Sequence, residues 1–179
     1  MSETLTWLPA ADHPELLAPP VAGVVERLTK EGRDVQAAAI DPSDADTEAF
    51  CARYGEPLEE SANCVVVAGK RGGVVKYAAC LILATTRADI NGLVRRHIDV
   101  RKVSFAPLDE VVAATGMAYG GVTPLGLPTD WPVLVDAVVA SRSSIVIGSG
   151  RRESKLRVSG ATLAALPAAE VLDSLGLPR

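Results

Sequence analysis

Two apolar segments joined by a short basic turn constrain the fold more than any other feature of this sequence. Residues 63–68 and 74–83 are rich in Val, Ile and Cys, which favour extended backbone, and Lys70-Arg71-Gly72-Gly73 stands between them. Two adjacent glycines tolerate the positive φ angles that a tight turn between strands requires. The sequence therefore predicts an antiparallel β-hairpin.

Helices and further short strands are predicted in an irregular order around this hairpin. Helical spacing or capping signals are found at 14–30, 47–54, 89–97, 107–114, 161–166 and 168–175. Strands are expected at 35–40, 100–105, 133–139, 144–147 and 155–158. Strict alternation of strand and helix is missing, so we expect an α/β protein of the α+β type, with a mixed, largely antiparallel sheet flanked by helices.

The chain is long enough to bury a sizeable core within one domain. No internal repeat or linker divides its 179 residues, so a single domain is expected over 1–179, with 1–13 as a loose N-terminal arm. Aromatic residues make up only 4% of the sequence, so the core must be built from Ala, Val, Leu and Ile. The longest apolar runs are too short to cross a bilayer and no signal peptide is visible, so we predict a cytoplasmic protein without membrane contact.

Charge and metal-ligating residues exclude some functions. A net charge of −4 does not suggest a general nucleic-acid binder, yet basic residues gather at 95–102, at 151–157 and at Lys70-Arg71. Acidic residues lie mostly before Ser61, so an acidic protein could still present a basic face. The alternative is that each basic cluster is an ordinary solvated surface. The three cysteines and two histidines lack metal-ligand spacing, so no metal site is expected.

The segment 115–128 is the best candidate for a functional loop. It holds four glycines and two prolines together with Met, Tyr, Val and two Leu, which is too apolar for a solvated linker. Such a loop can offer backbone N–H groups to an anion or a polarised carbonyl. The alternative is a structural double turn between a helix and a strand.

Side-chain nucleophiles are not indicated. The sequence has no G-x-S-x-G elbow, no metal-binding His pair and no Walker loop, and a second glycine loop, Gly148-Ser149-Gly150, lacks the following helix of a dinucleotide site. The two glycine loops are therefore the candidate chemistry, with polar groups available from Ser61, Asn63, Thr123, Ser149 and Ser154. Arg101 or Lys102 could neutralise a phosphate or carboxylate.

Three segments resemble the prolyl-tRNA editing domain family, the YbaK-type aminoacyl-tRNA deacylases and the editing insertions of prolyl-tRNA synthetases. They are 61–67 (SANCVVV), the strand start at 101–103, and 115–126 (TGMAYGGVTPLG), and the match continues through 134–136 and 145–150. The resemblance covers roughly residues 20–175. It implies a barrel-like mixed sheet flanked by helices, and hydrolysis of the ester that joins an incorrect amino acid to tRNA, without a cofactor.

The resemblance also implies where the site lies. The first glycine loop would form one wall of the aminoacyl pocket, with Gly120, Gly121 and Thr123 in catalytic roles together with Asn63, and the second loop would form another wall. Substrate contacts would come from Tyr119, Val122, Pro124, Gly148, Ser149, Gly150 and Ser154. Contacts with tRNA would come from Arg101, Lys102, Arg151, Arg152 and Lys155.

The chain departs from the family pattern at three of these positions. Asn63 stands where the family has a functional lysine, Cys64 where threonine is common, and Ser154 in place of an acidic residue after the second glycine loop. Asparagine supplies hydrogen bonds but no charge. The leading prediction is a free-standing editing hydrolase that acts through backbone amides. The alternatives are a module that binds an aminoacyl-adenosine or tRNA end without hydrolysis, and a hydrolase of another ester or amide. The sequence does not indicate an oligomeric state.

Overall fold

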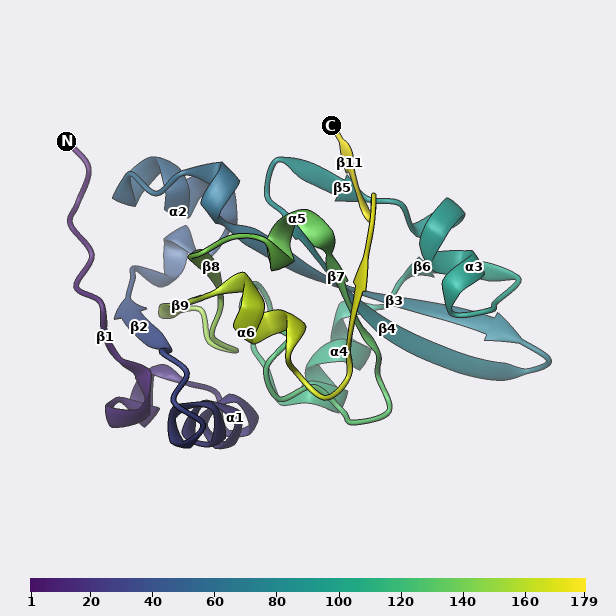
Figure 1. Ribbon diagram of the computed structural model, residues 1–179, viewed down its shortest axis with the longest axis horizontal. Helices are drawn as coiled ribbons and strands as arrows, with labels where there is room; N and C mark the ends of the chain where they lie inside the picture. Colours follow the sequence, from purple (N-terminus) through teal and green to yellow (C-terminus); the bar gives the residue numbers. More distant parts are fainter.

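A five-stranded mixed sheet forms the centre of the computed structural model, which describes all 179 residues (Figure 1). Its order is β10-β7-β4-β3-β6, and β4 pairs antiparallel with β3 but parallel with β7. The strands are β3 (Ala62–Arg71), β4 (Val74–Leu83), β6 (Lys102–Phe105), β7 (Val133–Asp136) and β10 (Ala169–Leu172).

A second, wholly antiparallel sheet has the order β1-β2-β9-β8. A parallel bridge between Ser61 and Val146 connects its β8 edge to the beginning of β3. Its strands are β1 (Leu8–Pro9), β2 (Gln36–Ala39), β8 (Ile145–Gly148) and β9 (Ser154–Val158), and β5 (Thr86–Ala88) pairs separately with β11 (Gly176–Pro178). The predicted mixed, largely antiparallel architecture is confirmed.

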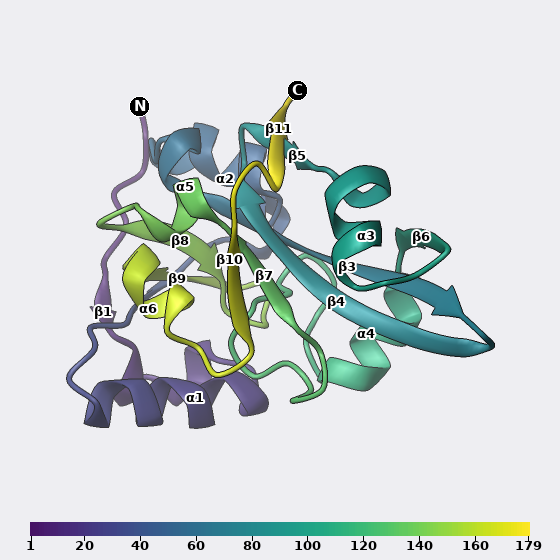
Figure 2. The same ribbon diagram turned by 45° about the vertical axis from the view of Figure 1, so that its right-hand side comes forward.

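Short helices cover the sheets (Figure 2). They are α1 (Pro19–Lys30), α2 (Thr47–Tyr54), α3 (Arg95–His97), α4 (Leu108–Thr115), α5 (Ala137–Ala140) and α6 (Gly160–Ala164), and a π-helical turn over Ile90–Val94 precedes α3. The largest core cluster joins α1 to both sheets, and a second cluster lies on the other face of β4. Because β4 is buried on both faces over Ala78–Leu83, this part of its sequence is a continuous apolar run.

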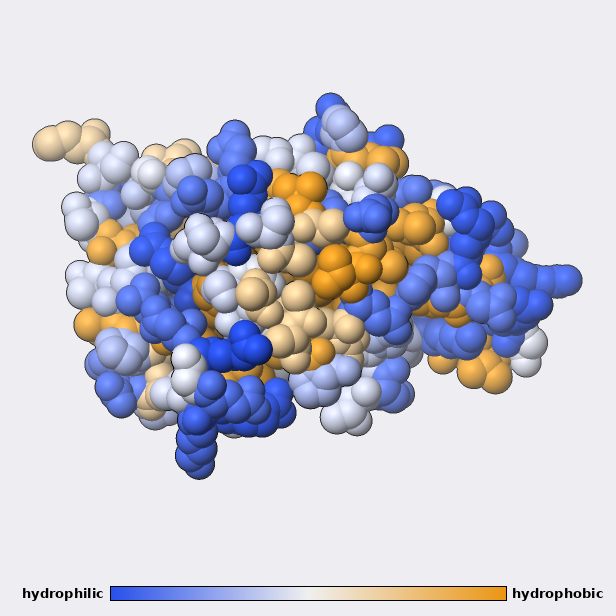
Figure 3. Space-filling view, in the orientation of Figure 1, coloured by the Kyte–Doolittle hydropathy of each residue, from blue (hydrophilic) through white to orange (hydrophobic).

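The predicted hairpin is confirmed and is longer than the sequence indicated. Gly72 and Gly73 have φ angles of 58° and 79°, as a tight turn between twisted strands requires. The end of the hairpin, residues 68–77, projects from the body of the molecule, and β6 pairs along its β3 edge. We call residues 68–77 and β6 the hairpin extension (Figure 1). Its tip is largely hydrophilic (Figure 3).

The boundaries of α2 follow directly from capping chemistry. Asp46 accepts hydrogen bonds from the backbone N–H groups of Glu48 and Ala49 at 3.0 and 3.3 Å, which satisfies two free donors of the first turn. Gly55 ends the helix in the left-handed conformation with φ 70°. The predicted helix at 47–54 is confirmed.

Two predictions near the N-terminus were wrong. The N-terminal arm is not loose throughout, because β1 pairs with β2 and Ala10 is fully buried with its N–H bonded to the Val35 carbonyl. The helix predicted from residue 14 begins only at Pro19, after a 3-10 turn over Pro14–Leu16. Two consecutive prolines fit the first turn of a helix but not its interior, so the regular helix begins with them.

Two predictions in the C-terminal third were also wrong. The strand expected at 133–139 ends at Asp136, whose side chain caps α5. The helix expected at 168–175 is instead β10, which runs parallel to β7 in register with it. A four-residue segment is too short for its periodicity to distinguish a strand from a helix, and here the free edge of β7 decides the outcome.

The buried carboxylate of Asp136 gives a stability prediction. It accepts from the Val138 N–H at 3.4 Å and from the Gly176 N–H at 3.0 Å, so it joins β7 to α5 and to the C-terminal strand. Asp136→Ala leaves both donors without this acceptor and is expected to lower the free energy of unfolding by about 2 kcal/mol. Urea denaturation measures this loss; Asp136→Asn should lose less, and the exposed Asp130→Ala should lose almost nothing. Equal stability of all three variants would contradict the assignment.

Candidate functional site

A hollow of about 260 Å³ lies where the N-terminus of α2, the first half of β3, the first glycine loop and β9 meet. Its lining includes Asp46, Asn63, Gly120, Val122, Gly148 and Lys155. These residues come from five separate segments of the chain, so only the tertiary fold assembles them.

The edge of β3 is open beside this hollow. On that side β6 pairs with β3 only over residues 67–70, and β8 meets the chain only at Ser61. The stretch Ala62–Val65 therefore has no strand partner on this edge, and all four of its residues line the hollow. Backbone donors and acceptors at an open edge are available to a ligand.

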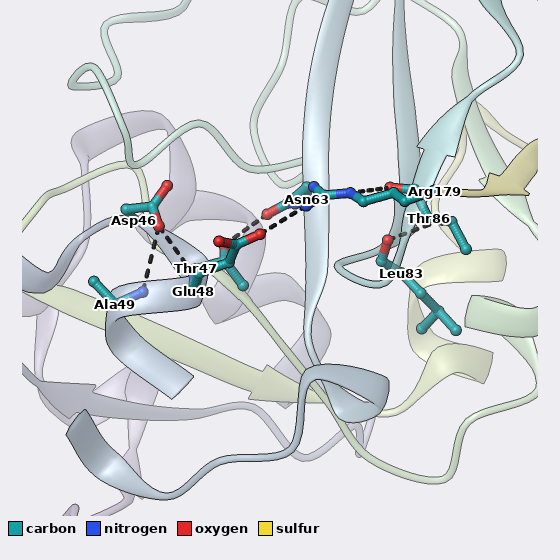
Figure 4. Close-up of polar contacts among 8 residues, drawn as sticks. All are labelled: Asp46, Thr47, Glu48, Ala49, Asn63, Leu83, Thr86 and Arg179. Atoms are coloured by element: carbon teal, nitrogen blue, oxygen red, sulfur yellow. Dashed lines mark hydrogen bonds and ion pairs between the residues drawn. The ribbon is translucent and has the colours of Figure 1, made fainter. Parts of the chain in front are cut away.

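Asn63 is held in place by the beginning of α2. The Thr47 hydroxyl donates to Oδ1 of Asn63 at 2.6 Å, next to the capping carboxylate of Asp46 (Figure 4). The Nδ2 group of Asn63 then has no protein acceptor, and the residue lines the hollow. Asn63 thus offers a hydrogen-bond donor of fixed orientation and no charge.

Lys155 is the most unusual residue of the hollow. It is 6% exposed, its Nζ donates to the Ala45 carbonyl at 2.7 Å, and it lies 5.3 Å from the centre of the Phe50 ring. No carboxylate pairs with it. Desolvation lowers its pKa from 10.5 to about 8, although Cys51 and Asp46 act in the opposite direction. At neutral pH this side chain is a buried ammonium group that faces a cavity.

This position corrects the sequence-based assignment of Lys155 to the tRNA-binding surface. The residue was grouped with Arg151 and Arg152 by its place in the sequence, but β9 turns it into the interior. Because Ser154 and Leu156 are buried as well, no alternation of polar and apolar residues marks Lys155 as an inward-facing residue. The sequence signal that could have found it is weak.

The two glycine loops contact each other directly, backbone against backbone. A Cβ atom on Gly148 would lie 2.6 Å from the Gly121 carbonyl oxygen, and one on Gly121 would lie 2.5 Å from the carbonyl oxygen of Arg151. The glycines are thus needed for the approach of the loops to one another. The backbone that these glycines allow to approach is therefore that of the other loop.

Not all amides of the first loop are free. The Gly121 N–H donates to the Ala118 carbonyl at 2.9 Å, so the structure excludes it as a donor to a ligand. The N–H groups of Gly120 and Val122 donate to no protein acceptor, and both residues line the hollow. These two amides replace Gly121 as the candidate backbone donors.

Three residues of the second loop region serve the loop itself. Ser149 is fully buried and its hydroxyl lies 2.7 Å from that of Ser154, which in turn donates to the Leu16 carbonyl. Gly150 has φ 83° and lies against Ala18, where a Cβ would approach to 2.4 Å. Ser149, Gly150 and Ser154 therefore shape the wall from behind and do not line the hollow. Gly148 does line it.

The remaining predicted residues of the first loop point elsewhere. Thr123 is completely buried and its hydroxyl has no protein partner, whereas Pro124 lines a different, apolar cavity beside Trp131. Tyr119 is 60% exposed, with the Arg152 guanidinium 5.6 Å from its ring centre. Neither Thr123, Pro124 nor Tyr119 lines the hollow.

The basic residues divide into two groups. Arg152 donates to the carbonyls of Tyr119 and Pro42, both at 3.0 Å, and so ties the first glycine loop to the turn before α2. Arg151 is half-buried beside it. Arg101 and Lys102 are exposed on the hairpin extension and are not part of the hollow.

Burial disfavours the thiolate form of all three cysteines. Burial raises the pKa of the Cys64 thiol well above its usual range, burial also raises that of Cys51, and burial raises that of Cys80 to about 12. No group of three or more His, Cys, Asp or Glu side chains is arranged to hold a metal ion. No helix is long and apolar enough to span a bilayer.

A family model, the aminoacyl-tRNA editing domain, matches residues 41–166. The match covers more than half of the chain and includes α2, β3, both glycine loops and β9. The chain belongs to the aminoacyl-tRNA editing domain family. The family suggested by the glycine-loop motif is confirmed, and the hollow of this editing domain lies entirely within the matched segment.

Solved structures confirm the fold. A hypothetical protein matches with a TM-score of 0.74 at 24% identity, covering 85% of this chain and 97% of that chain. A protein described as a candidate trans-editing enzyme for prolyl-tRNA synthetase matches with a TM-score of 0.71 at 24% identity, covering 87% and 94%. Most of this editing domain thus has the same fold as both.

The buried charge of Lys155 gives a prediction for stability. The folded protein releases this proton near pH 8, whereas the unfolded chain keeps it up to about 10.5, so the unfolded state binds more protons between these values. The free energy of unfolding should therefore rise with pH in this window, by roughly 3 kcal/mol. Lys155→Met should lack this rise and be at least as stable at pH 7. Urea midpoints of both proteins at pH 7.5 and 10 test it; parallel pH dependences would contradict the burial of the charge.

Proposed function

We propose that this editing domain hydrolyses the ester bond of a mischarged aminoacyl-tRNA. The family supports the reaction class, and the similarity to a candidate trans-editing enzyme supports a free-standing protein. The observation that carries the proposal is the buried ammonium group of Lys155, which faces the hollow without a carboxylate partner. An unneutralised buried cation is costly to the fold and is characteristic of a functional site.

The proposed mechanism uses water as the nucleophile. Water adds to the ester carbonyl and forms a tetrahedral intermediate, which collapses to release the amino acid and the ribose hydroxyl of tRNA. The developing oxyanion is stabilised by the Lys155 ammonium and by the free amides of Gly120 and Val122. The raised pKa of the Cys64 thiol makes it unsuitable as a nucleophile.

Asn63 and Asp46 are proposed to orient the substrate. The Nδ2 group of Asn63 donates to an oxygen of the terminal ribose, and the carboxylate of Asp46 attracts the α-ammonium group of the amino acid. The apolar wall consists of Ala45, Val65 and Val122, and the hollow measures about 260 Å³. This space favours a small amino acid and excludes large side chains, as a sieve for editing does.

In this proposal Lys155 of β9 supplies the positive charge that the family's functional lysine would supply at the position of Asn63. The two residues line the same hollow from different segments of the chain. A positive charge is therefore present in the site although Asn63 carries none. A module that binds the aminoacyl end without hydrolysis is the second candidate, favoured by Asn63 itself.

Deacylation of a panel of mischarged tRNAs tests the function. Lys155→Met should lower kcat/KM by about 100- to 1000-fold, because it removes charge from the oxyanion site. Lys30→Met, which changes an exposed lysine of α1, should behave as wild type. Wild-type activity in the Lys155→Met variant would reject the mechanism. Tight binding of acylated tRNA without turnover in any member of the panel would establish the binding module instead.

The pH dependence of the reaction tests the charge state of Lys155. Since the ammonium form stabilises the oxyanion, enzymatic kcat/KM should fall as pH rises through about 8, the pKa of this group in the folded protein. The spontaneous hydrolysis of the ester must be subtracted at each pH. The residual activity of Lys155→Met should not show this fall. A rate that rises through pH 8 only in the wild type would assign Lys155 as a general base.

A further inference from the structure

We infer that the hairpin extension binds the phosphate backbone of tRNA, at a distance from the aminoacyl end. This inference rests on the proposed function, because it assumes that tRNA is the substrate. It concerns a surface outside the hollow, formed by residues 68–77 of β3 and β4 together with β6 (Figure 1).

The charge of the chain is concentrated in the segment that builds this surface. Residues 68–77 and 102–105 contain four Lys and Arg residues and no Asp or Glu residue, a net charge of +4. The rest of the chain contains fourteen basic and twenty-two acidic residues, a net charge of −8. A strongly basic region on an acidic protein is the electrostatic pattern expected of a local nucleic-acid contact.

Two lysines of the hairpin extension repel each other in the free protein. Lys70 of β3 lies directly opposite Lys102 of β6 in the antiparallel register, and both are exposed. Like charges directly opposite each other destabilise a pair of strands. No carboxylate pairs with either lysine, whereas the neighbouring Arg71 pairs with Asp99. A bound phosphate between the two ammonium groups would remove the repulsion.

The surface beside these lysines suits a sugar-phosphate chain. Lys70 and Lys102 line a hollow of about 550 Å³ together with Val75, Tyr77, Ser104 and Glu110. The Tyr77 ring is stacked on Trp131 at 4.9 Å, and its hydroxyl donates to Glu110 at 2.8 Å, so this wall is rigid. Cations next to an aromatic and apolar floor are typical of surfaces that follow a nucleic-acid backbone.

Strand β3 connects this surface to the candidate site. Asn63 lies in the first hollow and Lys70 follows seven residues later on the same extended strand, which corresponds to about 23 Å. The hairpin extension is therefore too far from the ester to take part in its hydrolysis. It can contact only nucleotides that lie several positions away from the aminoacylated 3′ end.

The test uses Lys70→Gln/Lys102→Gln in the full chain, with a mixture of non-acylated tRNA as the binding probe. Affinity should fall about tenfold near 0.1 M salt, and the slope of log affinity against log salt should decrease by about two. The melting temperature should stay equal or rise, because the repulsion is removed. A matched control, Arg27→Gln/Lys30→Gln, changes two exposed cations of α1 that already pair with Glu31 and Glu26. It should change neither the tRNA affinity nor the salt slope.

Hydrolysis separates this inference from the proposed function. The double variant should raise KM for aminoacyl-tRNA without changing kcat, and should hydrolyse a 3′-aminoacyl-adenosine at the wild-type rate. Unchanged tRNA affinity and salt slope, or an equal loss on the adenosine substrate, would overturn the inference. Equally tight binding of polyglutamate, lost in the same variant, would assign the surface to an acidic protein instead. If the wild type hydrolyses no ester but the variant still loses tRNA binding, the inference stands and the proposed function fails.

Discussion

The close approach of the two glycine loops is the contact on which the candidate site depends. Gly148 and Gly121 allow two backbones to touch where any side chain would collide with a carbonyl oxygen. This contact fixes the position of the first loop, and so places Gly120 and Val122 on the same hollow as Lys155. A more distant loop would leave the amides and the ammonium group in separate sites.

The hollow combines features that are each unfavourable for folding. The ammonium group of Lys155 is desolvated, two loop amides have no protein acceptor, and the edge of β3 is unpaired over four residues. All three unfavourable features lie in the same hollow. The surrounding sheets and α1 bury the apolar surface that stabilises the fold. Natural proteins accept such local costs where a site must bind a polar ligand, which is why their coincidence is more informative than any one of them.

Local chemistry made much of the fold predictable. The glycine pair in the hairpin turn and the helix at 47–54 depend on residues that are close in sequence, so the sequence alone located them. Gly148, which the resemblance placed in the second wall, lines the hollow. Predictions failed where partners distant in sequence decide, as for β10, which is a strand because β7 offers it a parallel edge. They also failed for the amide of Gly121, since a turn bond to Ala118 uses its hydrogen.

The sequence by itself determined the family, the glycine loops and the asymmetric distribution of charge. Motifs and the positions of charged residues along the chain can be read directly from the order of the residues. Only the tertiary structure decided which side chains meet. It placed Lys155 in the same hollow as Asn63 and joined the buried side chains of Ser149 and Ser154 by a hydrogen bond. It also set Lys70 opposite Lys102. Strand register and burial depend on contacts between segments that are dozens of residues apart, and no local pattern encodes them.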